Sequence, residues 1–269
     1  MSTQIDLFLD SIVNAPVKDD RALMEFPFFS LQKRPLMEKL VYDDGQVRIE
    51  VSPGEKGVAT IWDKDVLIYL ASLINDRIER GLPVDRKVQF AAHDLLALAK
   101  RGTGKQAYEL LKDALFRLRS TTITTSIKSA GDVEERGFGW IDSWKIVRRK
   151  RSDGKEVMQA VEVTLNDWMF RAIVQDRRVL TINPAYFALD KGMERRLYEL
   201  ARKHVGEQPE WRIGLEKLAA KCGSRQELRY FKRDLIKLAE SDTLPDYTIR
   251  VEEDVSRRRG VTVLFMPRG

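Results

Sequence analysis

The sequence has almost no cysteine and very little histidine. Its 269 residues contain one cysteine, Cys222, and two histidines, His93 and His204. One cysteine cannot form an intrachain disulfide or a Cys₂His₂ zinc finger. The two histidines lie too far apart in the sequence for an H-E-x-x-H zinc site. We therefore expect no metal and no cofactor, and a reducing, cytoplasmic compartment.

Long apolar segments are also missing. No run approaches the ~18–20 apolar residues that a transmembrane helix needs. Near the N-terminus, Asp6 and Asp10 interrupt the apolar stretch 7–9. The basic and then apolar pattern of a secretory signal is therefore absent, and we expect no membrane partner.

Charge of neither sign dominates the chain. Lys and Arg number 47 against 41 Asp and Glu, which gives a net charge of +6, and 43% of the residues are hydrophobic. This composition is typical of a globular protein, and at about 100–200 residues per domain the length predicts two domains. A small positive excess is compatible with an anionic partner but does not identify one. The positions of the basic residues in the sequence must therefore indicate what the partner is.

The first sixty residues are predicted to form an irregular arm and a hairpin. Residues 47–51 alternate at period two, residues 53–57 have turn composition, and residues 58–62 resume a strand. An apolar patch at residues 24–29 precedes them, and we expect it to pack on the first domain.

From Asp65 the apolar spacing becomes helical, and the order of predicted elements is informative. A helix over 65–81 is followed by a short strand at 88–90, a second helix, a tight turn, and a third helix that begins at Lys105. Two strands over 138–165 follow, after a β-branched stretch. This is the order of a winged helix, a helix-turn-helix followed by a β-hairpin wing, here with an enlarged wing.

The second half repeats the scheme. A helix with apolar Met193 and Leu197, surrounded by arginines that include Arg195 and Arg196, precedes a short strand, a helix, a helix predicted over 225–239, and two strands. A shift of 120 positions places Tyr108, Leu111, Leu115 and Leu118 on Leu228, Phe231, Leu235 and Leu238. Such self-similarity indicates a duplicated unit.

The fold prediction follows from this duplication. We expect an α+β protein of two tandem winged-helix domains, mainly helical with β-hairpin wings. Residues 1–178 would form the arm and the first domain, with the enlarged wing, and residues 179–269 the second domain.

The sequence offers little catalytic chemistry. The segment 102–105, Gly-Thr-Gly-Lys, is similar to part of a phosphate loop, but a Walker motif needs a glycine where Ala99 stands and a Ser or Thr where Gln106 stands. The two histidines lie in separate halves, so they cannot form a metal cluster beside a nucleophile, and we expect them to cap helices or lie at the surface. We predict that the protein is not an enzyme.

The basic residues gather opposite the apolar seams of the two presumed recognition helices and at the two hairpin tips. A helix in the major groove presents its N-terminal side chains to base edges, and basic tips suit phosphates or the minor groove. An ordinary solvated face is the alternative for both helices, and a solubilising loop for each tip. The candidate DNA-binding residues are Lys105, Gln106, Lys112, Arg148, Arg149, Lys150, Arg151, Lys155, Arg225, Gln226, Arg229, Lys232, Arg233, Arg257, Arg258 and Arg259.

Three segments of the sequence resemble a known family. Residues 24–31, 180–187 and 193–200 are similar to signatures of replication initiator protein A, a family of bacterial plasmids and related elements, and the resemblance covers nearly the whole chain. It implies tandem winged-helix domains that bind repeated origin sites (iterons), open an adjacent A·T-rich segment and recruit host replication proteins. It also implies monomers at the origin and dimers that repress the protein's own promoter.

The predicted function is thus sequence-specific binding of double-stranded DNA to initiate plasmid replication. Other functions remain open from the sequence. One is a dedicated transcriptional regulator with the same fold, and another is a winged-helix adaptor that binds a protein partner. A nuclease or a primase is the enzymatic alternative.

Overall fold

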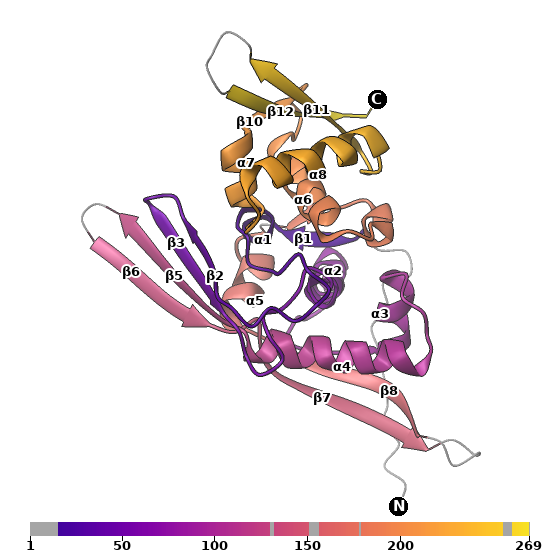
Figure 1. Ribbon diagram of the computed structural model, residues 1–269. Coiled ribbons are helices and arrows are strands. Elements are labelled where there is room, and N and C mark those ends of the chain that lie inside the picture. Colours follow the sequence, from indigo (N-terminus) through magenta and orange to yellow (C-terminus); the bar gives the residue numbers. More distant parts are fainter. Residues whose placement is uncertain (1–15, 130–131, 151–155, 178, 255–259, 269) are drawn as a thin grey trace, which may run out of the picture.

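The computed structural model describes residues 16–129, 132–150, 156–177, 179–254 and 260–268. Figure 1 shows two groups of helices and strands stacked on each other, one built from the first two thirds of the chain and the other from the last third. Each group has its own hydrophobic core, and the two cores contain mainly residues before and after about position 178. The boundary between domains at 178 and 179 stays a prediction.

The first group is built from three helices and a three-stranded antiparallel sheet. Its strand order is β4-β8-β7. In α4, Leu111, Leu115 and Leu118 recur on one face and are fully buried, which anchors the helix on this core. The elements are α2 (Lys64–Glu79), β4 (Lys87–Ala91), α3 (Ala92–Leu98), α4 (Lys105–Ser120), β7 (Ile141–Lys150) and β8 (Glu156–Leu165).

The second group repeats this order of elements. Its sheet has the order β10-β12-β11, so its first, last and middle strands occupy the positions of β4, β8 and β7. Phe231, Leu235 and Leu238 are buried on α8, as the shift of 120 positions predicts from α4. The elements are α6 (Gly192–His204), β10 (Trp211–Gly214), α7 (Leu215–Lys221), α8 (Leu228–Ser241), β11 (Tyr247–Asp254) and β12 (Gly260–Pro267).

An additional sheet accounts for the enlargement of the first group. The hairpin of β5 (Thr122–Ser129) and β6 (Asp132–Phe138) is inserted between α4 and β7 and pairs through β5 with β3 (Val47–Ser52). The partner of β3 on its other side is β2 (Leu40–Asp43), in a sheet of order β2-β3-β5-β6. Residues 58–62 are therefore not the second strand of the predicted hairpin. They form a buried irregular segment.

Short elements link the two groups. They are β1 (Lys18–Asp20), α1 (Arg21–Glu25), β9 (Val179–Thr181) and the 3₁₀ helix η1 (Pro184–Ala188). Helix α5 (Asp167–Val174) precedes β9 and packs in the first core through Met169 and Ile173. β1 pairs antiparallel with β9, which joins the beginning of the described chain to the beginning of the second group. Phe28 and Phe29 pack on Trp140 in the first core, as predicted for the apolar patch at 24–29, whereas Met24 lies in the second core.

Two details of the predicted fold are wrong. Among the described residues, strands occupy nearly as much of the chain as helices. The fold is therefore mixed α/β rather than mainly helical, and the inserted sheet, which was not predicted, contributes much of this strand content. The helix predicted over 225–239 begins only at Leu228. Gly223 has a φ of +64° and the Ser224 hydroxyl accepts from the Gln226 amide, so residues 224–227 form a turn before the helix.

In the part of the chain that the structure describes, no helix is both long and apolar enough to cross a bilayer. The same residues contain no group of three or more His, Cys, Asp or Glu side chains placed to hold a metal ion.

Candidate nucleic-acid interface

The outer face of α8 combines arginines with an aromatic ring. The seam of Phe231, Leu235 and Leu238 faces the core, and Arg229, Tyr230 and Arg233 lie on the opposite, exposed side. The guanidinium of Arg229 lies 4.6 Å and that of Arg233 5.2 Å from the centre of the Tyr230 ring, and this ring is 40% exposed. Tyr230 thus holds two cationic groups side by side on the surface.

The remaining predicted residues near α8 lie around this cluster. Arg225 and Gln226 are exposed in the turn that precedes the helix, and Arg225 forms an ion pair with Glu38 of the arm. Lys232 is half-buried, and its Nζ lies 2.6 Å from the Glu253 carboxylate on β11. Arg225 and Gln226 were predicted to lie on the recognition helix, but they precede it and border its N-terminal end.

The corresponding face of α4 has a different chemistry. Lys105, Gln106 and Lys112 are exposed, as predicted. Under the shift of 120 positions, however, Glu109, Leu110 and Asp113 take the places of Arg229, Tyr230 and Arg233. Leu110 is 49% exposed, and Asp113 forms an ion pair with Lys56. The two similar helices therefore present a cationic face on α8 and a mixed face on α4.

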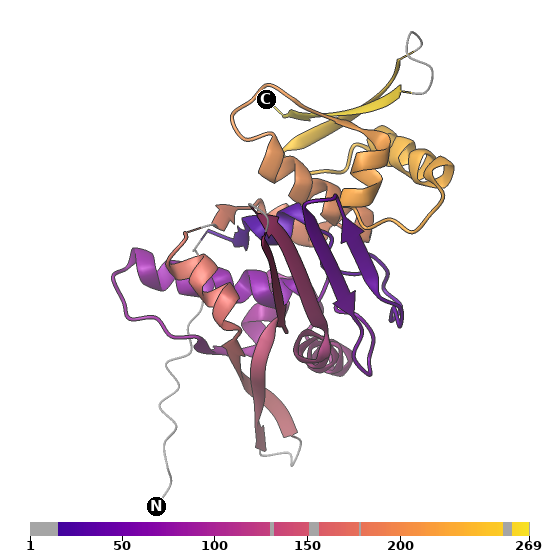
Figure 2. The same cartoon turned by 90° about the vertical axis from the view of Figure 1, so that its left-hand side faces the viewer.

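The hairpin tips are only partly described. Arg148 and Arg149 are exposed near the end of β7. Lys150 is the last residue of β7, and its side chain lies outside the described residues, as do Arg151, Lys155, Arg257, Arg258 and Arg259 altogether. In Figures 1 and 2 the hairpins β7–β8 and β11–β12 extend from opposite ends of the molecule.

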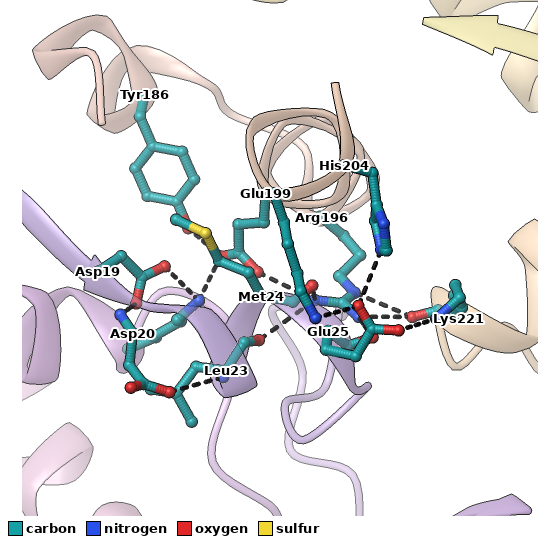
Figure 3. A network of polar contacts seen from close by, with 12 residues as sticks. Asp19, Asp20, Leu23, Met24, Glu25, Tyr186, Arg196, Glu199, His204 and Lys221 are labelled. Atoms are coloured by element: carbon teal, nitrogen blue, oxygen red, sulfur yellow. Dashed lines mark hydrogen bonds and ion pairs between the residues drawn. The ribbon is translucent and has the colours of Figure 1, made fainter. Parts of the chain in front are cut away.

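A network of buried charges joins the two groups of elements where α2 meets α6. Lys64 of α2 lies 2.6 Å from Asp19 and 2.8 Å from Glu199 of α6, and the Tyr186 hydroxyl donates to the same Glu199 carboxylate at 2.7 Å (Figure 3). Burial raises the pKa of Asp19 to about 7, although the Lys64 ammonium opposes this rise. Lys64 thus offsets only part of the cost of burying the carboxylate.

Two consecutive arginines of α6 extend the network. Arg195 donates to Asp65 of α2 at 2.6 Å. Arg196 donates to Glu199, to the carbonyl of Lys221 in α7 and to the carbonyls of Met24 and Glu25 in α1. Both arginines are 2% exposed. The sequence analysis placed them around the apolar face of this helix and did not predict their burial, because Asp65 and the carbonyls of residues 24 and 25 lie more than a hundred residues away.

His204 closes the network on the side of α1. Its ring stacks on Trp211 with centroids 4.4 Å apart, and its Nε2 lies 2.8 Å from the Glu25 carboxylate, which also contacts Lys203 and Lys221. His204 is therefore a structural residue of the junction rather than the helix cap or surface residue that we predicted. His93, in contrast, has an exposed side chain at the start of α3.

Comparison with known proteins identifies the family. The model of the family "Replication initiator protein A" matches residues 18–249. A protein of Wigglesworthia glossinidia brevipalpis named as a replication protein is 35% identical over 243 residues, which are 90% of this chain and 87% of that protein. Among solved structures, one crystal structure of domains 2 and 3 of RctB has a TM-score of 0.65 at 16% identity, with 92% of this chain and 98% of that chain covered. A second structure of these domains has a TM-score of 0.60 at 16% identity, with 90% and 95% covered.

Fold and sequence thus define a mixed α/β protein of the replication-protein type. The chain belongs to the replication initiator protein A family. The three signature segments acquire a structural meaning here, because each supplies members of the buried network. Residues 24–31 supply Glu25, residues 180–187 supply Tyr186, and residues 193–200 supply Arg195, Arg196 and Glu199. Tyr230 is the surface residue that sequence reasoning missed; its position between Arg229 and Arg233 at helical spacing was the available signal.

Proposed function

We propose that the protein initiates replication of a plasmid by binding double-stranded DNA at repeated origin sites, without catalysis. Both groups of elements would act as winged helices, with α4 and α8 in successive major grooves and the hairpins β7–β8 and β11–β12 as wings. The observation that carries this proposal is the exposed Arg229–Tyr230–Arg233 cluster on α8, on the face opposite its buried seam. Family membership supports the role in replication.

The two units would contribute unequally to DNA affinity and to sequence specificity. The face of α8 offers guanidinium groups that suit the O6 and N7 of guanine, so α8 would supply most of the sequence specificity. The face of α4 offers Lys105, Gln106 and Lys112 beside Glu109, and it would add affinity and register through phosphates. Arg148 and Arg149 would extend these phosphate contacts along the first wing.

Selection of bound sequences from a random duplex pool tests this function. We expect direct repeats whose two half-sites are separated by about one helical turn, roughly 10 bp. Arg229→Ala should weaken binding to the selected site by about 1–3 kcal/mol and relax base preference at one position. Arg80→Ala, at an exposed residue just after α2, is the control. An equal loss on selected and random duplexes would refute the assignment of Arg229 to base recognition.

The proposal includes the regulatory and cellular context of such an initiator. A monomer would bind the origin, a dimer would repress the protein's own promoter, and host replication proteins would be recruited in the cytoplasm. A plasmid-maintenance assay on a replicon that lacks its initiator separates this role from that of a dedicated transcriptional regulator, because a regulator would repress the promoter without maintaining the replicon.

A protein-binding role of the first unit is favoured by one observation. Leu110 is exposed on α4 between Glu109 and Asp113, where α8 carries Tyr230 between arginines. If the whole molecule were a winged-helix adaptor, it would bind no duplex even at low salt. Measurable binding of random duplex at 50 mM salt would therefore exclude the adaptor as the sole function.

A further inference from the structure

The contact between α2 and α6 is made by charges that are almost inaccessible to solvent. Lys64 and Asp65 belong to α2, and Arg195 and Glu199 belong to α6. Lys64 lies 2.8 Å from Glu199 and Arg195 lies 2.6 Å from Asp65, with exposed side-chain fractions of 3% or less for all four groups. Each of these ion pairs therefore joins one unit to the other.

Buried ion pairs constrain orientation more strictly than apolar contacts do. An apolar contact tolerates small sliding movements, whereas separating a buried ion pair leaves both charges desolvated and unpaired. The guanidinium of Arg195 is held from three directions, because it donates to Asp65, to the carbonyl of Leu189 at 2.9 Å and to that of Phe187 at 3.3 Å. A rotation of α6 against α2 would break at least one of these hydrogen bonds.

The orientation of α2 and α6 determines how far apart α4 and α8 lie. α4 shares the first core with most of the buried residues of α2, and α8 shares the second core with α6, so each recognition helix follows its own unit. Ile68 of α2 lies in the second core and adds an apolar contact at the junction. Figure 1 shows α4 and α8 on either side of the α2–α6 junction, both running across the view. A change at the junction would therefore be transmitted to the distance and the angle between the two helices.

We infer that Arg195, with the Lys64–Glu199 pair, is a positioning residue that sets the spacing between the two half-sites the protein accepts. The inference rests on the proposed function. A displacement of one half-site by 2 bp moves its groove by about 7 Å along the duplex and about 70° around it. A rigid junction cannot follow this displacement, so the second unit would lose its contacts.

The test uses the full chain and duplexes that carry the selected half-sites at the preferred spacing, with 1–3 bp inserted or removed. Arg195→Met removes the three-way contact. Arg80→Met is the control, because Arg80 follows the end of α2, is exposed, and pairs with Asp76 of the same helix rather than with α6. Wild type and Arg80→Met should lose about 100-fold in affinity at a 2 bp offset, the range expected when one of two linked contacts is lost. Arg195→Met should lose less than about tenfold between the same two duplexes.

Binding to a single half-site separates positioning from recognition. Arg195→Met should bind this short duplex as tightly as wild type, since Arg195 is 2% exposed and cannot reach DNA. A spacing profile as steep as that of wild type would overturn the inference, and so would a wild type that tolerates all spacings. Absence of sequence-specific binding by the wild type would instead refute the proposed function.

A measurement without DNA covers the case in which Arg195→Met does not fold. Spin labels at Glu109→Cys on α4 and Glu240→Cys on α8 report the distance between the recognition helices, because both positions are exposed and native Cys222 is 1% exposed. We expect a narrow distribution in the wild-type background and a broader one with Arg195→Lys, which keeps the charge but loses the planar fork. Identical distributions would contradict the inference.

Discussion

Single side chains on α8 carry the chemistry on which DNA recognition would depend. Arg229 has an ion pair to Glu227 at 2.9 Å and Arg233 one to Asp234 at 3.1 Å, and these exposed pairs are weak. Such arginines can exchange a carboxylate partner for a base at little cost. The ring of Tyr230 between them limits their freedom, which lowers the entropy lost when they bind.

Replacing Tyr230 tests this role of the ring. Tyr230→Leu should weaken binding to the selected duplex about 5–30-fold. Two exposed cation–π contacts of about 0.5–1 kcal/mol each would no longer hold Arg229 and Arg233 in place before they bind DNA. Tyr230→Phe keeps the ring and should stay within about twofold of wild type. Equilibrium titration of both variants checks the prediction, and wild-type affinity in Tyr230→Leu would contradict it.

Glu25 makes stability depend on pH in a defined direction. Burial would raise the pKa of Glu25, but hydrogen bonds from His204, Lys203 and Lys221 outweigh it and hold this pKa well below the ordinary value of 4.5. A carboxylate with a lowered folded-state pKa stabilises the fold above its ordinary pKa, and this contribution is lost as the pH falls below 4.5.

The variant Glu25→Gln lacks this titration. At pH 7 we expect it to be less stable than wild type by about 1.5–3 kcal/mol, the size of hydrogen bonds to charged groups. The difference should shrink as the pH falls from 5 to about 3, because Glu25 of the unfolded wild-type chain takes up a proton in this range while folded Glu25 stays ionised. Urea unfolding at several pH values measures it, with exposed Glu240→Gln as control. A difference that stays constant over this range would contradict the assignment.

At the scale of elements, the contrast between α4 and α8 predicts two kinds of loss. Lys112→Gln on α4 should weaken selected and random duplexes alike and reduce the slope of log K against log salt by about 1. Arg229→Gln on α8 should act mainly on the selected duplex. Titrations of both variants over a salt series check this. Equal sequence dependence of the two losses would show that α4 and α8 do not differ in role.

The elements also show how far sequence reasoning extends. Most of the apolar seam on α4 and α8 was predicted correctly, since local apolar spacing defines it. Leu228 is the exception, because it was predicted to face the core but begins α8 and is 37% exposed. The pairing of β3 with β5 and the burial of Arg195 beside Asp65 were not predicted, because these partners lie far apart in the chain. The local pairing of β2 with β3 was missed because residues 58–62 were predicted to be the partner strand. Periodicity identifies which side of a helix is apolar, but it cannot show that a charged side chain beside that face meets a buried carboxylate.

At the scale of the whole molecule, two linked units imply strong dependence on ionic strength. If six to ten phosphates are contacted, affinity should fall by about 10³–10⁵ between 50 and 200 mM salt. A weaker dependence, with a fall below about tenfold, would mean that one unit at most contacts DNA. Filter binding or fluorescence anisotropy on the selected duplex across this range measures the fall.

The single cysteine thiol offers a way to measure transient local opening of the native state. Cys222 directly follows α7 and lies inside the second core, and burial raises its pKa to about 12. Since only the thiolate attacks electrophiles, a maleimide or disulfide reagent should modify the protein no faster than this core opens transiently. The rate of modification of this one natural thiol therefore reports the rate of local opening, without any engineered probe.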